Sequence, residues 1–201
     1  MELSNRLKAV ADMVSAGNIV CDVGCDHGYV SIYLIQNKIC PKVIAMDVNA
    51  GPLTQAKEHI KAFGLGEYIE TRLSDGVKAL SIGEADSLIL AGMGGRLVIK
   101  ILTEGKEKID SLKELILQPQ SEIETVRAYL RENGYEISRE NMIYEDGKYY
   151  PMMKATRVSE KKTSMGEPQV TYDRYGEFLL KNQHPVLLQF LLWERQKDEE
   201  V

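Results

Sequence analysis

Cysteine is scarce in this chain of 201 residues, which contains only Cys21, Cys25 and Cys40. Their number is odd and no two of them form a CxxC pair, so the sequence excludes a framework of disulfide bonds. His27 is the only other soft metal ligand in this stretch, which leaves too few groups for a typical zinc site. We therefore expect three reduced, buried thiols and no metal.

A surplus of basic residues is also missing. The sequence has 25 Lys and Arg residues against 30 Asp and Glu residues, which gives a net charge of −5. Bulk charge therefore gives no argument for nucleic-acid binding, and any surface that binds RNA must be a local patch.

Long apolar segments are absent as well. No apolar run approaches the roughly 20 residues that cross a bilayer, and no charged start leads into the apolar core of a signal peptide. We expect a cytoplasmic protein without membrane contact, and we favour a monomer.

What the sequence does contain is an alternation of strand-like and helix-like segments. Apolar runs and β-branched residues predict strands at residues 19–23, 42–46, 68–73, 86–91 and 114–118. Helical periodicity predicts helices at residues 4–14, 29–36, 52–63, 77–80, 96–102 and 122–133, with Ser4 as the first N-cap. Strands joined by such helices form right-handed crossovers, so we expect a doubly wound, Rossmann-like α/β fold with a mostly parallel sheet.

The pattern changes at Gly134, after which residues 135–144 and 149–157 predict two strands. The pair Asp146-Gly147 between them is typical of a β-hairpin. We therefore expect the main domain to close with a pair of antiparallel strands.

The last part of the chain has a different composition. Residues 159–168 are polar and lack periodicity, which indicates a linker. Two apolar stripes follow, and Pro185 fits the first turn of the second, so a helical hairpin is predicted. We expect one domain at residues 1–158, and a linker with a small coiled-coil-like helical hairpin at residues 159–201.

The strongest local signal is the turn at residues 22–28, with the sequence Asp-Val-Gly-Cys-Asp-His-Gly, between a predicted strand and a predicted helix. Its two glycines allow a ligand to approach the backbone. A dinucleotide site would need glycine where Asp26 and Tyr29 stand, which argues against NAD. Carboxylates here suit a ligand that carries an ammonium and a sulfonium, as S-adenosyl-L-methionine does. The candidate cofactor-binding residues in this turn are Asp22, Gly24, Cys25 and Gly28.

Two further acids follow the next two predicted strands. Asp47, followed by Val48, lies roughly 20 residues after the glycine turn, the spacing at which an acid accepts the ribose hydroxyls. Asp75, followed by Gly76, could accept the exocyclic amine of an adenine, although it could equally be an ordinary turn residue. Because the carboxyl ends of parallel strands share one edge of the sheet, these acids predict a single cofactor site.

The fourth predicted strand ends in Gly92-Met93-Gly94-Gly95, an unusually bare loop. Enzymes that methylate the exocyclic amines of DNA bases carry an Asn/Asp-Pro-Pro-aromatic tetrad at this place, and the chain lacks it. We therefore expect an acceptor other than an exocyclic base amine, received by Gly92 and Met93. Gly92 is also a candidate cofactor-binding residue.

These motifs together resemble the bacterial tRNA (adenine-22 N1)-methyltransferase family (TrmK). The resemblance covers residues 3–157 and depends on Leu3-Ser4-Asn5-Arg6-Leu7, the turn with Asp26-His27, Asp75-Gly76, and the loop at residues 91–95. It implies a class I methyltransferase domain followed by a helical domain, S-adenosyl-L-methionine as cofactor, and methylation of N1 of an adenine in tRNA.

The implied reaction asks for positioning more than for acid–base chemistry. N1 of adenine already has an in-plane lone pair, and because it lies on the pairing edge the base must be flipped out to react. We take Asp26 as a candidate for stabilising the positive charge of the product and His27 as a lesser candidate for accepting a proton. His27 could instead only cap or pack against the following helix.

Basic residues near these motifs are candidates for contact with RNA, and they are Arg6, Lys8, Arg96 and Lys100. Two alternatives to the tRNA reaction stay open at this point. One is a methyltransferase that acts on another RNA base or on a small molecule. The other is a non-catalytic cofactor-binding module that interacts with RNA.

Overall fold

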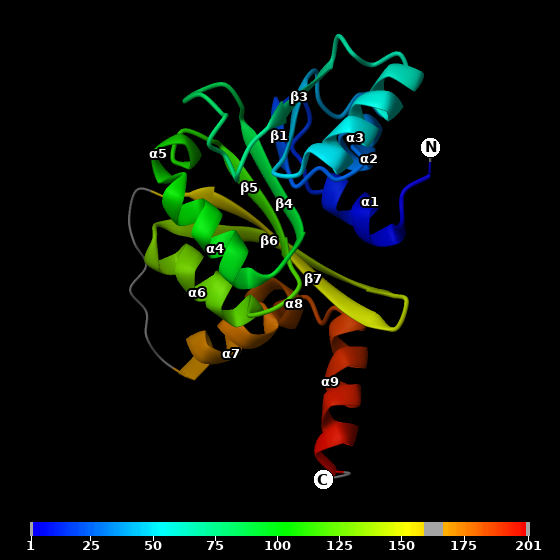
Figure 1. The fold of residues 1–201 in the computed structure, drawn as a ribbon. Coiled ribbons are helices and arrows are strands. Elements are labelled where there is room, and N and C mark those ends of the chain that lie inside the picture. Colours follow the sequence, from blue (N-terminus) through cyan, green and yellow to red (C-terminus); the bar gives the residue numbers. More distant parts are fainter. Residues whose placement is uncertain (1, 159–166, 200–201) are drawn as a thin grey trace.

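The computed structural model describes residues 2–158 and 167–199 of the chain. It contains a seven-stranded sheet with the order β3-β2-β1-β4-β5-β7-β6 (Figure 1). The strands are β1 (Val20–Val23), β2 (Val43–Asp47), β3 (Ile69–Leu73), β4 (Ser87–Met93), β5 (Glu114–Pro119), β6 (Tyr135–Glu145) and β7 (Lys148–Arg157). The first five are parallel, which confirms the predicted doubly wound α/β architecture.

Helices cover both faces of this sheet (Figure 1). One layer consists of α1 (Asn5–Ala11), α2 (Tyr29–Gln36) and α3 (Ala50–Ala62), and the other of α4 (Gly95–Glu104), α5 (Lys106–Ile109) and α6 (Ile123–Glu132). Alternate strand residues supply the two cores: Cys21 and Val23 of β1 face the α4–α6 layer, whereas Val20 faces the α1–α3 layer. Burial on both faces explains why these strands are almost continuously apolar in sequence.

Two short segments differ from the sequence prediction. Residues 77–80, predicted as a helix, form a turn in which the Leu80 amide donates to the Val77 carbonyl. The Ser74 hydroxyl accepts the Ala79 amide, and this side-chain bond replaces the bond that a helix would need. The sequence does not predict α5, because four residues carry too little periodicity to be detected.

The predicted hairpin is confirmed, and its tip lies beside the N-terminal helix. Asp146 and Gly147 have φ angles of 49° and 76°, the left-handed backbone that a tight turn of this kind requires. Strand β7 pairs antiparallel with both β5 and β6. The Glu145 carboxylate accepts the Asn5 amide at 2.8 Å, which joins the hairpin tip to α1.

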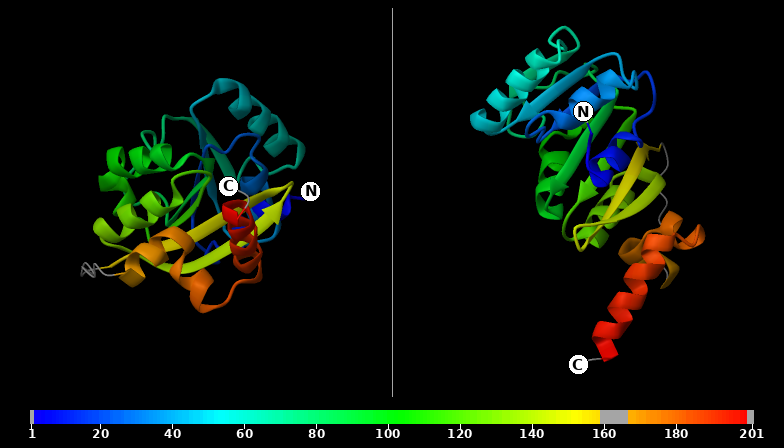
Figure 2. Two further views of the ribbon diagram at one scale, coloured as in Figure 1. Left: turned by 90° about the horizontal axis from the view of Figure 1, so that it is seen from below. Right: turned by 90° about the vertical axis from the view of Figure 1, so that its right-hand side faces the viewer.

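The tail consists of α7 (Glu167–Tyr175), α8 (Glu177–Lys181) and α9 (Pro185–Glu199). The first of the two predicted helical segments is divided at Gly176, whose φ of 93° no helix can contain. Helices α7 and α8 pack beside α6 and β6, whereas α9 extends away from the sheet (Figure 2). Most of the predicted linker, residues 159–166, lies outside the described residues. Within the described parts of the chain, no helix is long and apolar enough to cross a membrane.

A buried ion pair holds α7 and α8 against the domain. Arg127 Nε lies 2.8 Å from Glu140 Oε1, and the two side chains are 3% and 0% exposed. Arg127 also donates to the Asp173 carbonyl at the end of α7, and the other Glu140 oxygen accepts the Phe178 amide at the start of α8. A Cβ atom at Gly176 would lie 2.7 Å from Glu140 Oε1, so the break between the helices fits closely around this pair.

Candidate active site

The candidate site lies where the strand order reverses, between β1 and β4. The turn after β1 and the loop after β4 lie next to each other because these two strands are paired. Open α/β sheets bind their ligands in the crevice at such a switch point. Of the residues predicted from sequence, the structure brings together here the turn at residues 22–28, Asp47, Gly92 and Met93.

The turn after β1 is shaped by left-handed backbone at three positions. Gly24, Asp26 and Gly28 have φ angles of 71°, 51° and 74°. A Cβ atom at Gly24 would overlap the Met93 side chain, and one at Gly28 would lie 3.2 Å from the Cβ of Ala56. The absence of side chains at these two glycines therefore lets the turn pack closely against Met93 and Ala56.

Asp22 is a buried carboxylate at the end of β1. It is 4% exposed, and its Oδ2 accepts the Ser31 hydroxyl at 2.6 Å. Burial raises the pKa of Asp22 to about 6; the Ser31 hydrogen bond opposes this rise, and the negative charge of Asp47 adds to it. A cationic ligand group close to Asp22 would neutralise the negative charge of its ionised carboxylate.

Asp47 joins the first turn to the end of β2. Its Oδ2 accepts the Asp26 amide at 3.2 Å and its Oδ1 accepts the Asn49 amide at 2.8 Å. These bonds fix the carboxylate, which is 7% exposed, and leave lone pairs free for hydroxyl donors. The neighbouring Val48 side chain is 59% exposed and offers an apolar surface beside it.

The Cys25, Asp26 and His27 side chains have different environments. Cys25 is buried, and burial raises the pKa of its thiol, so the thiol stays protonated at neutral pH. Asp26 is 68% exposed and lies 3.4 Å from His27 Nε2. The His27 ring packs near the rings of Tyr29 and His59, with centroids 5.6 and 6.1 Å away. Its Nδ1 is buried without a hydrogen-bond partner in the described residues.

Asp75 lies at the same edge of the sheet but is engaged elsewhere. The preceding residue, Ser74, donates its amide to the Asp47 carbonyl, which places the turn at this edge. The Asp75 carboxylate forms an ion pair of 2.5 Å with Lys78. With Gly76 and Lys100, it lines a small hollow of about 60 Å³.

The loop after β4 is held by a neighbour that sequence reasoning missed. Gly92, with φ 78°, is the residue at which the register of β4 and β5 shifts. Its amide donates to Gln118 Oε1 at 3.2 Å, and Arg6 donates to the same oxygen at 2.9 Å. Gln118 is fully buried at the end of β5, so a buried side chain of the neighbouring strand holds the loop in place. A polar amide that ends an apolar strand is the sequence signal that could have identified it.

The basic candidates divide into one inward-facing residue and three exposed residues. Arg6 is directed toward Gln118 and lies 5.3 Å from the ring centre of Tyr150. A phosphate would have to compete with these contacts. Lys8 is exposed on α1, Arg96 pairs with Glu122 at 2.6 Å, and Lys100 lies 3.9 Å from Glu104.

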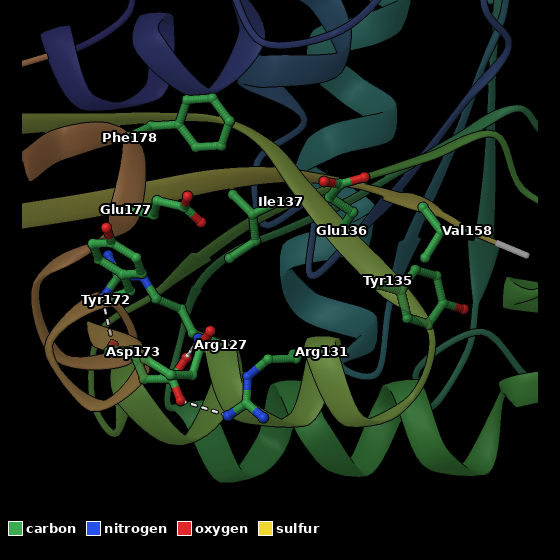
Figure 3. Close-up of a pocket in the computed structure, with 11 residues that line it drawn as sticks. Arg127, Arg131, Tyr135, Glu136, Ile137, Val158, Tyr172, Asp173, Glu177 and Phe178 are labelled. Atoms are coloured by element: carbon green, nitrogen blue, oxygen red, sulfur yellow. Dashed lines mark hydrogen bonds and ion pairs between the residues drawn. The ribbon is translucent and has the colours of Figure 1, made fainter. Parts of the chain in front are cut away.

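A larger cavity, of about 270 Å³, lies away from these turns, between α6, β6 and the tail (Figure 3). Arg131 and Asp173 meet across it at 2.6 Å, and Arg127 lines it beside them. The Arg131–Asp173 pair thus joins α6 of the domain to α7 of the tail across this cavity. We attribute the cavity to the docking of the tail and not to the candidate active site.

The chain is similar to known proteins in sequence and in structure. A family described as "Methyltransferase domain" matches residues 3–153. The tRNA (adenine(22)-N(1))-methyltransferase of Bacillus subtilis (strain 168) is 32% identical over 201 residues, which are 100% of this chain and 84% of that protein.

Two crystal structures are similar over nearly the whole chain. The B. subtilis M1A22 tRNA methyltransferase TrmK has a TM-score of 0.88 at 32% identity, covering 99% of this chain and 85% of that chain. A Streptococcus pneumoniae protein solved in complex with S-adenosyl-L-methionine has a TM-score of 0.90 at 35% identity, covering 98% of this chain and 90% of that chain.

Proposed function

This chain belongs to the bacterial tRNA (adenine-22 N1)-methyltransferase family, and from that membership we propose that it transfers a methyl group from S-adenosyl-L-methionine to N1 of adenine 22 in tRNA. The observation that carries the proposal is the placement of two glycine-containing turns, after β1 and after β4, on the two sides of the switch point. Buried carboxylates stand beside the first turn, and Gly92 in the second is exposed to solvent.

The residues around the first turn fit the cofactor. The Asp22 carboxylate would balance the cationic end, with the backbone of Gly24, Cys25 and Gly28 against the rest of the ligand. Asp47 has the free lone pairs to accept both ribose hydroxyls, and Val48 provides apolar contact. Asp75 and Gly76 would contact the adenine ring if the Asp75–Lys78 pair opens. When bound, the cofactor supplies a methyl group on a positively charged sulfur.

The loop after β4 would receive the acceptor base. The N1 lone pair of adenine forms the new bond directly, so no proton has to be removed and the protein's task is to hold N1 in line. The product ring is cationic, and we assign the Asp26 carboxylate, which is 68% exposed, to the stabilisation of that charge. Met93 bridges the two halves of the site, because its side chain lies against Gly24. His27 orients Asp26 through their contact.

The tRNA would reach this pocket with adenine 22 flipped from its stack. We assign Lys8, Arg96 and Lys100 to phosphate contact because their side chains are exposed on α1 and α4. Arg6 acts on the loop through Gln118 instead. We also propose that residues 1–158 hold the cofactor, that the tail at residues 159–201 serves tRNA binding, and that the protein is a cytoplasmic monomer.

The test is methylation of tRNA transcripts with labelled cofactor, followed by identification of the modified nucleoside. We expect 1-methyladenosine, and no label in a transcript that carries another base at position 22. A product methylated at N6, or equal labelling of the transcript without adenine 22, would contradict the assignment. A rise in salt should lower the rate, because phosphate contacts release counterions.

A further inference from the structure

The side chain of Gln120 lies beside the bare surface of Gly92. Its Nε2 is 3.8 Å from the point where a Cβ atom at Gly92 would stand, and Arg6 Nη1 is 3.7 Å from the same point. The Gln120 backbone amide donates to the Met93 carbonyl at 2.8 Å, so the residue is anchored to the loop. Among the described residues, its side-chain amide makes no hydrogen bond.

The chemistry of the reaction limits how the acceptor base can be recognised. N1 lies on the pairing edge of adenine, and this edge must face the methyl group during transfer. Groups of the protein can read the base at its Hoogsteen edge without blocking N1, because this edge presents the N6 amine as donor and N7 as acceptor. A glutamine amide matches this pair with one acceptor and one donor, whereas guanine presents two acceptors there.

The other polar groups around Gly92 cannot form this pair. Gln118 Oε1 already accepts from Gly92 and Arg6, and its Nε2 donates to the Pro119 carbonyl. Arg6 has donors only, so it cannot accept the N6 amine. Gln120 therefore has the matching donor and acceptor, and rotation of its amide lets either atom face either partner.

We propose that Gln120 is a specificity-determining residue, which holds the acceptor adenine by accepting from its N6 amine and donating to its N7 while N1 stays free. This inference rests on the proposed function, because it takes Gly92 as the surface that receives the base. It adds a reason for the choice of adenine that the bare loop alone does not provide.

The experiment compares two tRNA transcripts, one with adenosine and one with 7-deaza-adenosine at position 22. The deaza base keeps N1 and the N6 amine but lacks the N7 acceptor. We expect the wild-type protein to lose about tenfold in kcat/KM on the deaza transcript, within the range for one base contact. We expect Gln120→Ala to be about tenfold slower on the normal transcript and to lose nothing further on the deaza transcript.

Affinity for S-adenosyl-L-methionine, measured by calorimetry, should be equal in Gln120→Ala and wild type, which shows that the variant is folded. Gln36→Ala, at an exposed glutamine that ends α2, is the matched control and should behave as wild type on both transcripts. If Gln120→Ala loses a further tenfold on the deaza transcript, or the wild type does not distinguish the transcripts, the inference is wrong. With either result the wild-type protein still forms 1-methyladenosine, so the proposed function stands. If the wild-type protein forms no 1-methyladenosine, the proposed function is wrong as well.

Discussion

At the scale of single residues, Asp47 makes a sharp test of the cofactor site. Its carboxylate is fixed by the Asp26 and Asn49 amides and retains acceptor capacity. We expect Asp47→Ala to weaken S-adenosyl-L-methionine binding by about 1 to 3 kcal/mol, the scale of hydrogen bonds to a charged group. Calorimetry measures this, with Glu107→Ala on α5 as an exposed control. Unchanged affinity in a folded Asp47→Ala protein would remove Asp47 from the site.

The raised pKa of Asp22 predicts that the affinity for S-adenosyl-L-methionine depends on pH. Burial raises its pKa to about 6 in the folded protein, so the carboxylate gains a proton as the pH falls through that value. A protonated Asp22 cannot balance a cation, and we expect the affinity for S-adenosyl-L-methionine to be about tenfold weaker at pH 5 than at pH 7.5. Asp22→Asn should bind weakly at both values. An equal pH dependence in this variant would assign the effect to another group.

The raised pKa of Asp22 also makes the free energy of unfolding depend on pH. The folded-state pKa is above the ordinary value of 3.8, so between about pH 6 and 4 the folded protein binds a proton that the unfolded chain does not. This group therefore favours folding increasingly as the pH falls through that window, and its ionised form costs stability above it. Asp22→Asn should accordingly raise the free energy of unfolding at pH 7.5, as measured by urea titration without cofactor.

At the scale of elements, the attachment of α7 and α8 depends on the buried pair of Arg127 and Glu140. Arg127→Met would leave the Glu140 charge buried and uncompensated, and we expect a loss of about 3 to 5 kcal/mol in the free energy of unfolding. Arg131→Met removes a partly exposed ion pair and should cost less. Adding Glu140→Leu to Arg127→Met should restore most of the loss. Equal losses in the two single variants would contradict this role.

At the scale of the whole molecule, we expect α9 to be separate from the proposed cofactor site. Phe190 and Trp193 of α9 lie 5.2 and 6.0 Å from the ring centre of Tyr149 in β7, and Lys197 lies 4.1 Å from that of Trp193. The residues proposed to bind the cofactor lie instead at the ends of β1 and β2. A chain that ends at Gln183 should keep its affinity for S-adenosyl-L-methionine and lose several-fold in tRNA affinity. Calorimetry and filter binding measure the two, and a loss of cofactor binding would contradict the separation.

The sequence by itself determined the order of the elements and the place of the glycine- and acid-containing turn after β1. Strands buried on both faces are continuously apolar, and the glycines and acids of residues 22–28 follow the first of them, so local pattern was sufficient. The resemblance to a known family added the cofactor and the acceptor, which the comparisons support. Helix α2 begins and ends at the predicted residues, because Gly28 and Asn37 bound one apolar segment.

Only the tertiary structure decided which groups surround the loop after β4. Arg6, Gln118 and Gly92 are far apart in sequence and meet only because β5 pairs with β4 and α1 packs across their ends. The orientation of the Arg6 side chain toward Gln118 and the position of Gln120 beside Gly92 both follow from that pairing. The break at Gly176 has the same origin, since its left-handed backbone fits around Arg127 and Glu140 from distant elements. Local propensity is encoded in neighbouring residues, whereas contacts of this kind depend on the packing of the whole chain.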